Sequence, residues 1–410
     1  MKKTLAMLLA ALMLVSVLVA CGNDSEETSN AGTSGGETSN AGTSGGTPGT
    51  SQAADPAAPS TGAQTLGWYP DAYEASLNRE KYTIGCVFIA MSDQLHSALN
   101  VAFREWSQLL NFDYVSFDAN GSHDAFFSGL ETYAASPDIH GILIDIDASS
   151  HPRVLEIVDE YGATWFPAMS PFRNDAMTRY VAPAAVLEGY SCGQIQVDWM
   201  FDNYARELGV QEVDASNIGF ITLNWSPHPE INLRIIGAED RYNELYPNLL
   251  STNWIPIDVL PGSPANIEGA FDLVSAYLST NGSDFEYWFI GSATDEFAIG
   301  AARAVEQVGM ESKCIISAIM GGSIIEEWST GKTSTWRALI TTPLVGLAEP
   351  MVCGLLAVLD GRATFETLYQ EYVPAGESYG IIVYPPQVFT HDNWREYIST
   401  AEAWVAHKYQ

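Results

Sequence analysis

The sequence has few basic residues: 18 Lys and Arg stand against 50 Asp and Glu among 410 residues, which gives a net charge of −32. Such a surface repels phosphate backbones and anionic lipid headgroups, because proteins bind both through clusters of cations. We therefore exclude nucleic acid as a partner. Any attachment to a membrane has to depend on something other than a basic surface.

Cysteine is also scarce, and its spacing excludes the usual metal and redox motifs. Five cysteines occur and none forms a CxxC pair. Their spacing relative to the seven histidines fits no zinc site. Four of them lie in apolar runs, which favours buried free thiols over disulfides. We expect no metal and no cofactor. These four are Cys86, Cys192, Cys314 and Cys353.

The apolar run at the N-terminus is too short for a typical membrane-spanning helix. It extends from Leu5 to Val19 behind Lys2 and Lys3, which is the pattern of an export signal over residues 1–20. The run ends in Leu-Val-Ala-Cys, with Cys21 last, and this resembles the lipobox of bacterial lipoproteins. The resemblance implies that Cys21 is lipidated and holds the protein extracytoplasmically, at the outer face of the bacterial cell membrane.

Residues 21–64 have the composition of a flexible linker. The ten residues 27–36 are repeated without change at 37–46, and a stretch rich in Pro, Ala and Ser follows. Such a segment has too few apolar side chains to form a core. We predict a lipid-anchored tether here rather than a domain.

From residue 81 onward, short apolar runs alternate with longer amphipathic stretches. This alternation predicts an α/β protein with parallel strands covered by helices on both faces. The number of strands requires two sheets, so we expect two doubly wound lobes with a ligand-binding cleft beyond the carboxyl ends of the strands. The expected strands are 82–90, 114–117, 141–146, 164–168, 217–223, 254–259, 287–290 and 314–318. The expected helices are 95–110, 125–135, 153–161, 189–208, 231–246, 267–278, 296–308 and 323–329.

Six short segments of the sequence resemble segments that occur in the same order in the type I periplasmic binding proteins of sugar importers. The resemblance covers residues 81 to about 400. It implies two parallel-sheet lobes joined by a three-strand hinge, the first formed by 81–181 and 344–376 and the second by 182–341 and 377–410. The segments are Tyr82-Thr-Ile-Gly, Asp118-Ala-Asn-Gly, Gly141-Ile-Leu-Ile-Asp, Arg234-Ile-Ile-Gly, the run from Ile290 to Arg303, and Thr330-Gly-Lys-Thr-Ser-Thr.

The resemblance also implies which residues contact the ligand. They follow the strands of both lobes. From the first lobe they are Met91, Asp93, Gln94, Asp145, Met169, Phe172 and Arg173. From the second lobe they are Trp225, Asn232, Thr294, Asp295, Met320 and Thr341. The sequence departs from the ribose-binding pattern in the second lobe, where Asn232, Thr294, Met320 and Thr341 replace Arg, Asn, Asp and Gln. We interpret His96 as a residue of a helix N-terminus and Arg234 as a structural helix residue.

The resulting hypothesis is a monomeric solute-binding lipoprotein, not an enzyme, that delivers a sugar or sugar-like ligand to the permease subunits of an ABC transporter. Two binding alternatives stay open: a sensor subunit of the same fold, and a receptor for a nucleoside-like aromatic ligand. A third alternative is an exported serine hydrolase, because residues 189–193 fit the G-x-S-x-G pattern around Ser191. We disfavour it because residues 182–188 read as a loop or helix start rather than as a core strand.

Overall fold

The computed structural model describes residues 68–409 except 93, 227 and 260–266, all within one compact unit, Gly62–Gln410. The predicted signal peptide 1–20, the linker 21–64 with Cys21, and Asp93 lie outside the described residues. Within the described part of the chain, no helix combines the length and the apolar character that crossing a membrane requires.

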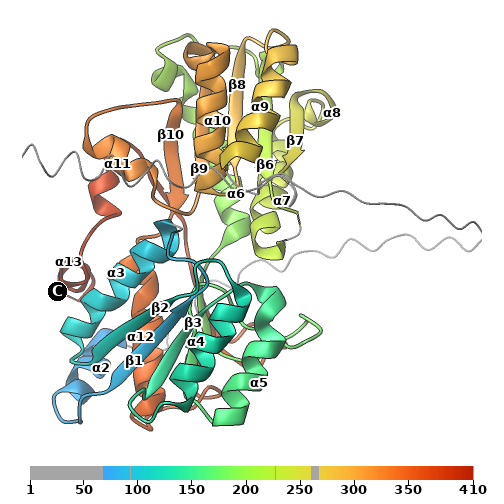
Figure 1. The fold of residues 1–410 in the computed structure, drawn as a ribbon. Coiled ribbons are helices and arrows are strands. Elements are labelled where there is room, and N and C mark those ends of the chain that lie inside the picture. Colours follow the sequence, from blue (N-terminus) through green and yellow to red (C-terminus); the bar gives the residue numbers. More distant parts are fainter. Residues whose placement is uncertain (1–67, 93, 227, 260–266, 410) are drawn as a thin grey trace, which may run out of the picture. The chain divides into compact units, whose positions relative to one another are not determined.

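The first lobe is built on a four-stranded parallel sheet in the order β2-β1-β3-β4 (Figure 1). A helix follows each of the first three strands, as the βα alternation predicted. The strands are β1 (Thr83–Phe88), β2 (Asp113–Asp118), β3 (Gly141–Asp145) and β4 (Trp165–Pro167). The helices are α3 (Gln94–Leu109), α4 (His123–Ala135), α5 (His151–Tyr161) and, from later in the chain, α12 (Leu344–Leu359).

Alternating side chains of β1 explain why helices cover both faces of this sheet. Cys86 and Phe88 belong to the core that includes buried residues of α3 and α12. Val87 lies between them in sequence and packs instead with buried residues of α4 and α5. Successive side chains of a strand point to opposite faces. An almost continuously apolar strand therefore needs an apolar layer on each side.

The second lobe has a six-stranded sheet in the order β12-β10-β9-β8-β6-β7, with helices on both faces. All neighbours are parallel except β12, which pairs antiparallel with β10 at the edge. The strands are β6 (Ile218–Asn224), β7 (Trp254–Asp258), β8 (Tyr287–Ser292), β9 (Cys314–Ile319), β10 (Trp336–Thr341) and β12 (Gln387–Phe389). The helices are α6 (Gly189–Leu208), α7 (Pro229–Leu245), α8 (Leu250–Asn253), α9 (Ile267–Asn281), α10 (Asp295–Val308) and α11 (Ile324–Ser329).

One local prediction is wrong. The segment expected to be a loop or helix start contains β5 (Ala184–Leu187), which pairs in parallel with β11 (Ile381–Tyr384). This pair forms a separate two-stranded sheet. Only four residues of β5 are extended, and Ala184 and Ala185 are small as well as buried. The strand therefore lacks the long apolar run by which the other strands were recognised.

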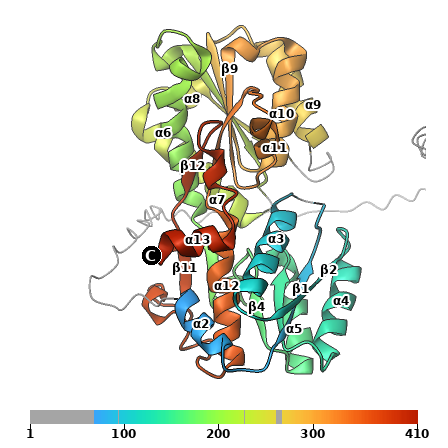
Figure 2. The ribbon, with the colours of Figure 1, turned by 90° about the vertical axis from the view of Figure 1, so that its left-hand side faces the viewer.

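The C-terminal helix lies against the first lobe, whereas residues 377–410 were predicted to belong to the second. Helix α13 (Ala401–Lys408) contacts α3 and α12 of the first lobe, and both ribbon views place it there (Figure 2). Its first residue donates a backbone hydrogen bond to Glu105 of α3, at 2.7 Å. After β12 the chain therefore returns to the first lobe, in addition to the crossings expected of a three-strand hinge.

A buried carboxylate anchors α13. The side chain of Glu349 in α12 is fully buried. It accepts hydrogen bonds from Trp404 Nε1 at 2.9 Å and from Lys408 Nζ at 2.8 Å. The hydroxyl of Tyr409 donates a third. A buried charge is tolerated when it is paired and hydrogen-bonded in this way.

The N-terminal helix α2 (Trp68–Ser76), which the sequence did not predict, also contacts α12.

The four cysteines at 86, 192, 314 and 353 are free and buried, which confirms the prediction. Burial raises the pKa of Cys192 to about 12. It also raises the pKa of the other three thiols. The thiolate is the reactive form of cysteine. These side chains therefore act as small apolar core residues.

Candidate functional site

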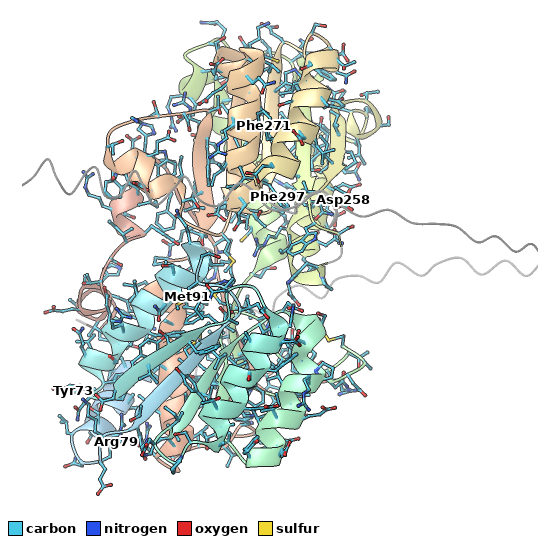
Figure 3. The ribbon with its side chains drawn as sticks, in the orientation of Figure 1. Tyr73, Arg79, Met91, Asp258, Phe271 and Phe297 are labelled. Atoms are coloured by element: carbon cyan, nitrogen blue, oxygen red, sulfur yellow. The ribbon has the colours of Figure 1, made fainter. Side chains whose placement is uncertain are left out.

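A cavity of about 480 Å³ lies at the carboxyl ends of strands from both sheets. From the first lobe it is lined by residues that follow β1, β2, β3 and β4, and from the second by residues that follow β6, β8 and β9. Leu187 of β5 and Gly189 of α6 complete the wall at a crossing between the lobes. This is the place at which open parallel sheets bind ligands. Figure 3 shows Met91 beside the first turn of α3 and Phe297, a lining residue, at the start of α10.

Two histidine–carboxylate pairs form the polar part of the first-lobe wall. His96 Nε2 lies 3.5 Å from Asp145 Oδ2, and the other ring nitrogen of His96 contacts the carbonyl oxygen of Ala90 at 2.9 Å. His123 Nε2 lies 2.8 Å from Asp147 Oδ2. Burial pushes the pKa of Asp147 up, but hydrogen bonds from Ser149 and His123 outweigh it, so this pKa lies below its ordinary value. The first-lobe wall is therefore rich in hydrogen-bond acceptors.

The second-lobe wall carries four buried polar atoms that have no hydrogen-bond partner among the described residues. They are Trp225 Nε1, His228 Nδ1, Arg234 Nε and Thr294 Oγ1. The indole and guanidinium nitrogens can only donate, whereas the imidazole nitrogen and the hydroxyl can donate or accept. Buried polar groups in native proteins are almost always hydrogen-bonded. These atoms are the candidate hydrogen-bond partners of a ligand that presents oxygen atoms to this wall.

Burial lowers the pKa of His228, with a smaller contribution from the nearby Arg234 cation. The ring is therefore neutral at neutral pH, and one of its nitrogens can accept a hydrogen bond. The ring centroids of His228 and Trp225 are 5.6 Å apart. Together the two rings give the wall a flat aromatic part next to its polar atoms.

Arg234 has a structural role and also lines the cavity. Its Nη1 donates to the carbonyl oxygen of Ala293 at 2.5 Å, and its Nη2 lies 3.0 Å from Met320 Sδ. These contacts tie α7 to the ends of β8 and β9, as the sequence interpretation of a structural helix residue suggested. Arg234 is also one of the residues that line the cavity, and its Nε is buried without a partner among the described residues. The sequence interpretation did not include it among the candidate site residues.

Six of the predicted site residues line the cavity: Asp145, Met169, Trp225, Thr294, Asp295 and Met320. Each lies at the carboxyl end of a strand, in the turn behind it or, for Asp295, at the start of the helix that follows. Asp295 is largely occupied by its own lobe, because its Oδ2 accepts hydrogen bonds from the backbone nitrogens of Gly322 and Ser323 at 3.3 and 3.4 Å. The Ser323 hydroxyl donates a third hydrogen bond to it.

Two predicted residues follow the fourth strand but point elsewhere. Phe172 is fully buried, and its ring stacks on His151 with the centroids 3.9 Å apart and the planes 13° apart. Arg173 pairs with Glu230 at 3.0 Å, and its guanidinium lies over the ring of Tyr180. Phe172 therefore belongs to the first-lobe core, and Arg173 lies beside the cavity rather than in its wall.

Four further predicted residues lie outside the cavity wall. Met91 packs on the core, and its backbone nitrogen donates to Asp118 Oδ1 at 3.0 Å. Gln94 is exposed at the start of α3. Asn232 accepts a hydrogen bond from Asn224 Nδ2 at 2.7 Å, and Thr341 is fully buried at the end of β10.

The prediction also omitted residues of the wall, namely His96, His123, Asp147, His228, Glu230 and Arg234. Most of them follow the carboxyl ends of strands, which is also where the predicted site residues were placed. His123 follows the loop after β2, Asp147 follows β3, and His228 and Glu230 follow β6. A systematic reading of every loop at the carboxyl ends of the strands would have included them.

The G-x-S-x-G segment is explained by helix packing, although a strand does precede it. Ser191 is the third residue of α6, and its backbone nitrogen donates to Glu188 at 3.0 Å. A Cβ on Gly193 would lie 1.8 Å from the carbonyl oxygen of Arg234, and one on Gly237 would lie 2.0 Å from that of Tyr190. These glycines allow α6 and α7 to pack closely. A hydrolase nucleophile would instead sit on the turn between strand and helix.

Within the described residues, no group of three or more His, Cys, Asp or Glu side chains could hold a metal ion.

The sequence matches no family model and no curated protein. The two doubly wound lobes, with a cavity at the ends of their strands, have the fold of the type I periplasmic binding proteins. An ABC transporter periplasmic solute-binding protein from Actinobacillus succinogenes, with bound D-allose, is 15% identical over 77% of this chain and 99% of that chain, with a TM-score of 0.57.

Two other solved structures show the same fold. The myo-inositol-binding protein of Caulobacter, bound to myo-inositol, is 13% identical over 77% of this chain and 95% of that chain, with a TM-score of 0.59. A solute-binding protein from Thermotoga lettingae, in complex with 5-methylthioribose, is 15% identical over 79% of this chain and 92% of that chain, with a TM-score of 0.57. At these identities the likeness establishes the fold.

Proposed function

We propose that this protein is an extracytoplasmic solute-binding lipoprotein of an ABC importer, and that it binds a sugar or sugar-like compound in the cavity between its lobes. One observation carries the proposal: four residues of the second-lobe wall each hold a buried polar atom without a partner among the described residues. The solved structures of this fold named above bind D-allose, myo-inositol and 5-methylthioribose. All three ligands present hydroxyl oxygens, which can accept from the donors of that wall.

The walls suit such a ligand because they are complementary. Asp145 and Asp147 supply acceptors from the first lobe, whereas Trp225 and Arg234 supply donors from the second. A hydroxyl group both donates and accepts. A polyhydroxylated compound can therefore bridge the two walls and draw the lobes together, in the hinge motion by which binding proteins close around their ligands.

The first experiment is a thermal-shift screen of the full chain, purified in detergent, against sugars, polyols, nucleosides and amino acids. A ligand at 100 times its dissociation constant stabilises a protein by about 2.7 kcal/mol, which is readily measured. We expect a shift with one or more sugars, polyols or sugar-containing compounds. A shift with amino acids alone would contradict the proposed ligand class.

The tether is tested separately. We propose that residues 1–20 direct export and that Cys21 carries a lipid, which leaves the binding domain on the outer face of the membrane as a monomer able to reach a permease. Replacement of Cys21 by Ala should move the protein from the membrane fraction to the soluble one without changing ligand affinity. The matched control is Cys353→Ala, because Cys353 is buried in the fold. This variant should stay in the membrane fraction.

A further inference from the structure

Three methionines have a left-handed backbone, a conformation that favours glycine. Their φ angles are 70° at Met169, 66° at Met320 and 55° at Met177. A long side chain is rarely found in this region, where Gly or Asn would be less strained. Met169 and Met320 line the cavity, one from each lobe. Met177 does not belong to the wall. Strained residues are retained where their side chains serve a function.

The strain at Met169 is confined to a very tight turn. The backbone nitrogen of Ser170 donates to the carbonyl oxygen of Ala168 at 2.9 Å. This closes a three-residue γ-turn around Met169, and a positive central φ makes such a turn rare and strained. The preceding residue is held in the sheet, because the nitrogen of Ala168 donates to Ile144 at 2.8 Å. The turn therefore fixes the backbone of Met169 at the end of β4.

Met320 is fixed in a comparable way at the end of β9. Its backbone nitrogen donates to the carbonyl oxygen of Ile340 at 3.0 Å, and its sulfur contacts Arg234 Nη2. The next residue, Gly321, also has a positive φ, of 85°, and its carbonyl accepts a hydrogen bond from the hydroxyl of Tyr397. Both methionines therefore occupy defined positions rather than loops that could relax.

The two methionines share the cavity wall with nine other apolar residues. Thioether side chains adapt to irregular apolar and aromatic surfaces. A fully hydroxylated ring would gain little from such neighbours, since each buried hydroxyl needs a hydrogen-bond partner. Other apolar lining residues are Ile89, Leu95, Ile146, Pro171, Val186, Leu187, Ile231, Phe297 and Ile319.

We infer that Met169 and Met320 are specificity-determining residues that hold an apolar substituent of the ligand, one from each lobe. The ligand class is therefore a hydroxylated compound that carries an alkyl group or an aromatic ring, rather than an unsubstituted sugar. This inference rests on the proposed function. It assigns the acceptor oxygens of the ligand to the wall that contains Trp225 and Thr294, and the substituent to the methionines.

The test compares matched compounds by isothermal titration of the full chain in detergent. The probes are adenosine against D-ribose and phenyl β-D-glucoside against D-glucose. We expect at least one substituted compound to bind at least about tenfold more tightly than its parent sugar, since burying an apolar group contributes that much affinity. Met169→Gly and Met320→Gly should each remove most of this difference while changing the affinity for the parent sugar little.

The matched control is Met177→Gly, which makes the same change at a positive φ outside the cavity and should leave both affinities unchanged. If a glycine variant fails to fold, as judged by circular dichroism, Met169→Asn and Met320→Asn replace it, because Asn tolerates this backbone conformation.

Two results would overturn the inference and leave the proposed function standing. The first is equal binding of substituted and parent compounds. The second is an equal loss of affinity for both compounds in the methionine variants, which would indicate only a structural role. A protein that binds none of the four probes also contradicts the inference. The wider ligand screen then decides separately whether the cavity is a solute site at all.

Discussion

Arg173 and Glu230 form an ion pair that joins the two lobes. Nη2 of Arg173, in the loop after β4, lies 3.0 Å from Oε1 of Glu230 in the first turn of α7. Their side chains are 23% and 31% exposed, so water screens the pair only in part. Because its partners come from different lobes, this contact exists only while the lobes are close, and it should favour the state that encloses a ligand.

Replacement of Arg173 by Gln should therefore weaken ligand binding modestly. Partly exposed ion pairs contribute at most about 1 kcal/mol, which corresponds to a loss of about fivefold in affinity or less. Titration at low and high salt gives the measurement, and the wild-type and variant affinities should converge at high salt. The control is Arg153→Gln, which breaks ion pairs to Glu131 and Glu156 within the first lobe. An equal loss in both variants would contradict a role specific to the interlobe pair.

Trp225→Phe removes the indole donor but keeps an aromatic face. If Trp225 Nε1 donates to the ligand, the variant should lose about 1 kcal/mol of binding free energy, or about fivefold in affinity, with little change in stability. Trp254→Phe is the matched control. The Nε1 of Trp254 also lacks a partner among the described residues, but it lies in the second-lobe core away from the cavity wall. Unchanged affinity in Trp225→Phe would remove this residue from the ligand contacts.

His151 should make the stability of the protein depend on pH. The side chain is fully buried against Phe172, and burial lowers its pKa to about 4. An unfolded histidine titrates near pH 6.5. Below that pH the unfolded state binds a proton that the folded state does not. The free energy of unfolding contributed by His151 should therefore fall as the pH falls from about 6.5 to about 4, by about 3 kcal/mol in total.

Urea unfolding at pH 7.5 and pH 5 measures this effect. In His151→Gln, which keeps a hydrogen-bond acceptor for the backbone nitrogen of Arg173, the loss of stability between the two pH values should be smaller than in the wild type. The control His407→Gln changes an exposed histidine of α13 and should keep the wild-type dependence. Identical pH dependence in all three proteins would show that His151 does not carry it.

Glu349→Gln should loosen the C-terminal helix from the first lobe. The substitution keeps the shape of the buried side chain but removes the charge that accepts from Trp404, Lys408 and Tyr409. Hydrogen bonds to charged groups contribute about 1.5 to 3 kcal/mol each, and Gln keeps part of this, so we expect a net loss of about 2 kcal/mol in the free energy of unfolding.

Hydrogen exchange of residues 401–408 gives the local readout for this variant, and exchange there should rise more than in the second lobe. Glu402→Gln, on the exposed first turn of α13, is the control and should change neither quantity. A loss of stability without increased exchange in α13 would point to an effect on the core around α12 rather than on the attachment of the helix.

Much of the fold could be predicted because parallel strands buried on both faces are continuous apolar runs. β3 and β9, each buried throughout, show this pattern. The prediction was wrong at β5, where two small alanines and only four extended residues form a strand because β11 pairs with it from almost 200 residues later. No local pattern contains that pairing. The attachment of α13 to the first lobe likewise depends on the buried Glu349, whose partners all lie more than 50 residues away.

The candidate site could be predicted only in part, because the sequence does not show in which direction each side chain points. The rule that ligands bind beyond the carboxyl ends of parallel strands selected loops that line the cavity, and it included Asp145, Trp225 and Met320. It does not say which side chain of a loop points into the cavity. Phe172 turns into the core and stacks on His151, whereas Met169, three residues earlier, lies in the cavity wall.

The sequence by itself determined the excess of acidic charge, the alternation of strands and helices, and the loops in which polar and aromatic residues gather, because these depend on composition and on local periodicity. The tertiary structure alone decided which of those residues meet. The pairing of Arg173 with Glu230, the four buried polar atoms without a partner among the described residues, and the positive φ angles of Met169 and Met320 depend on backbone geometry and on packing between distant segments. Those relationships define what the cavity can bind.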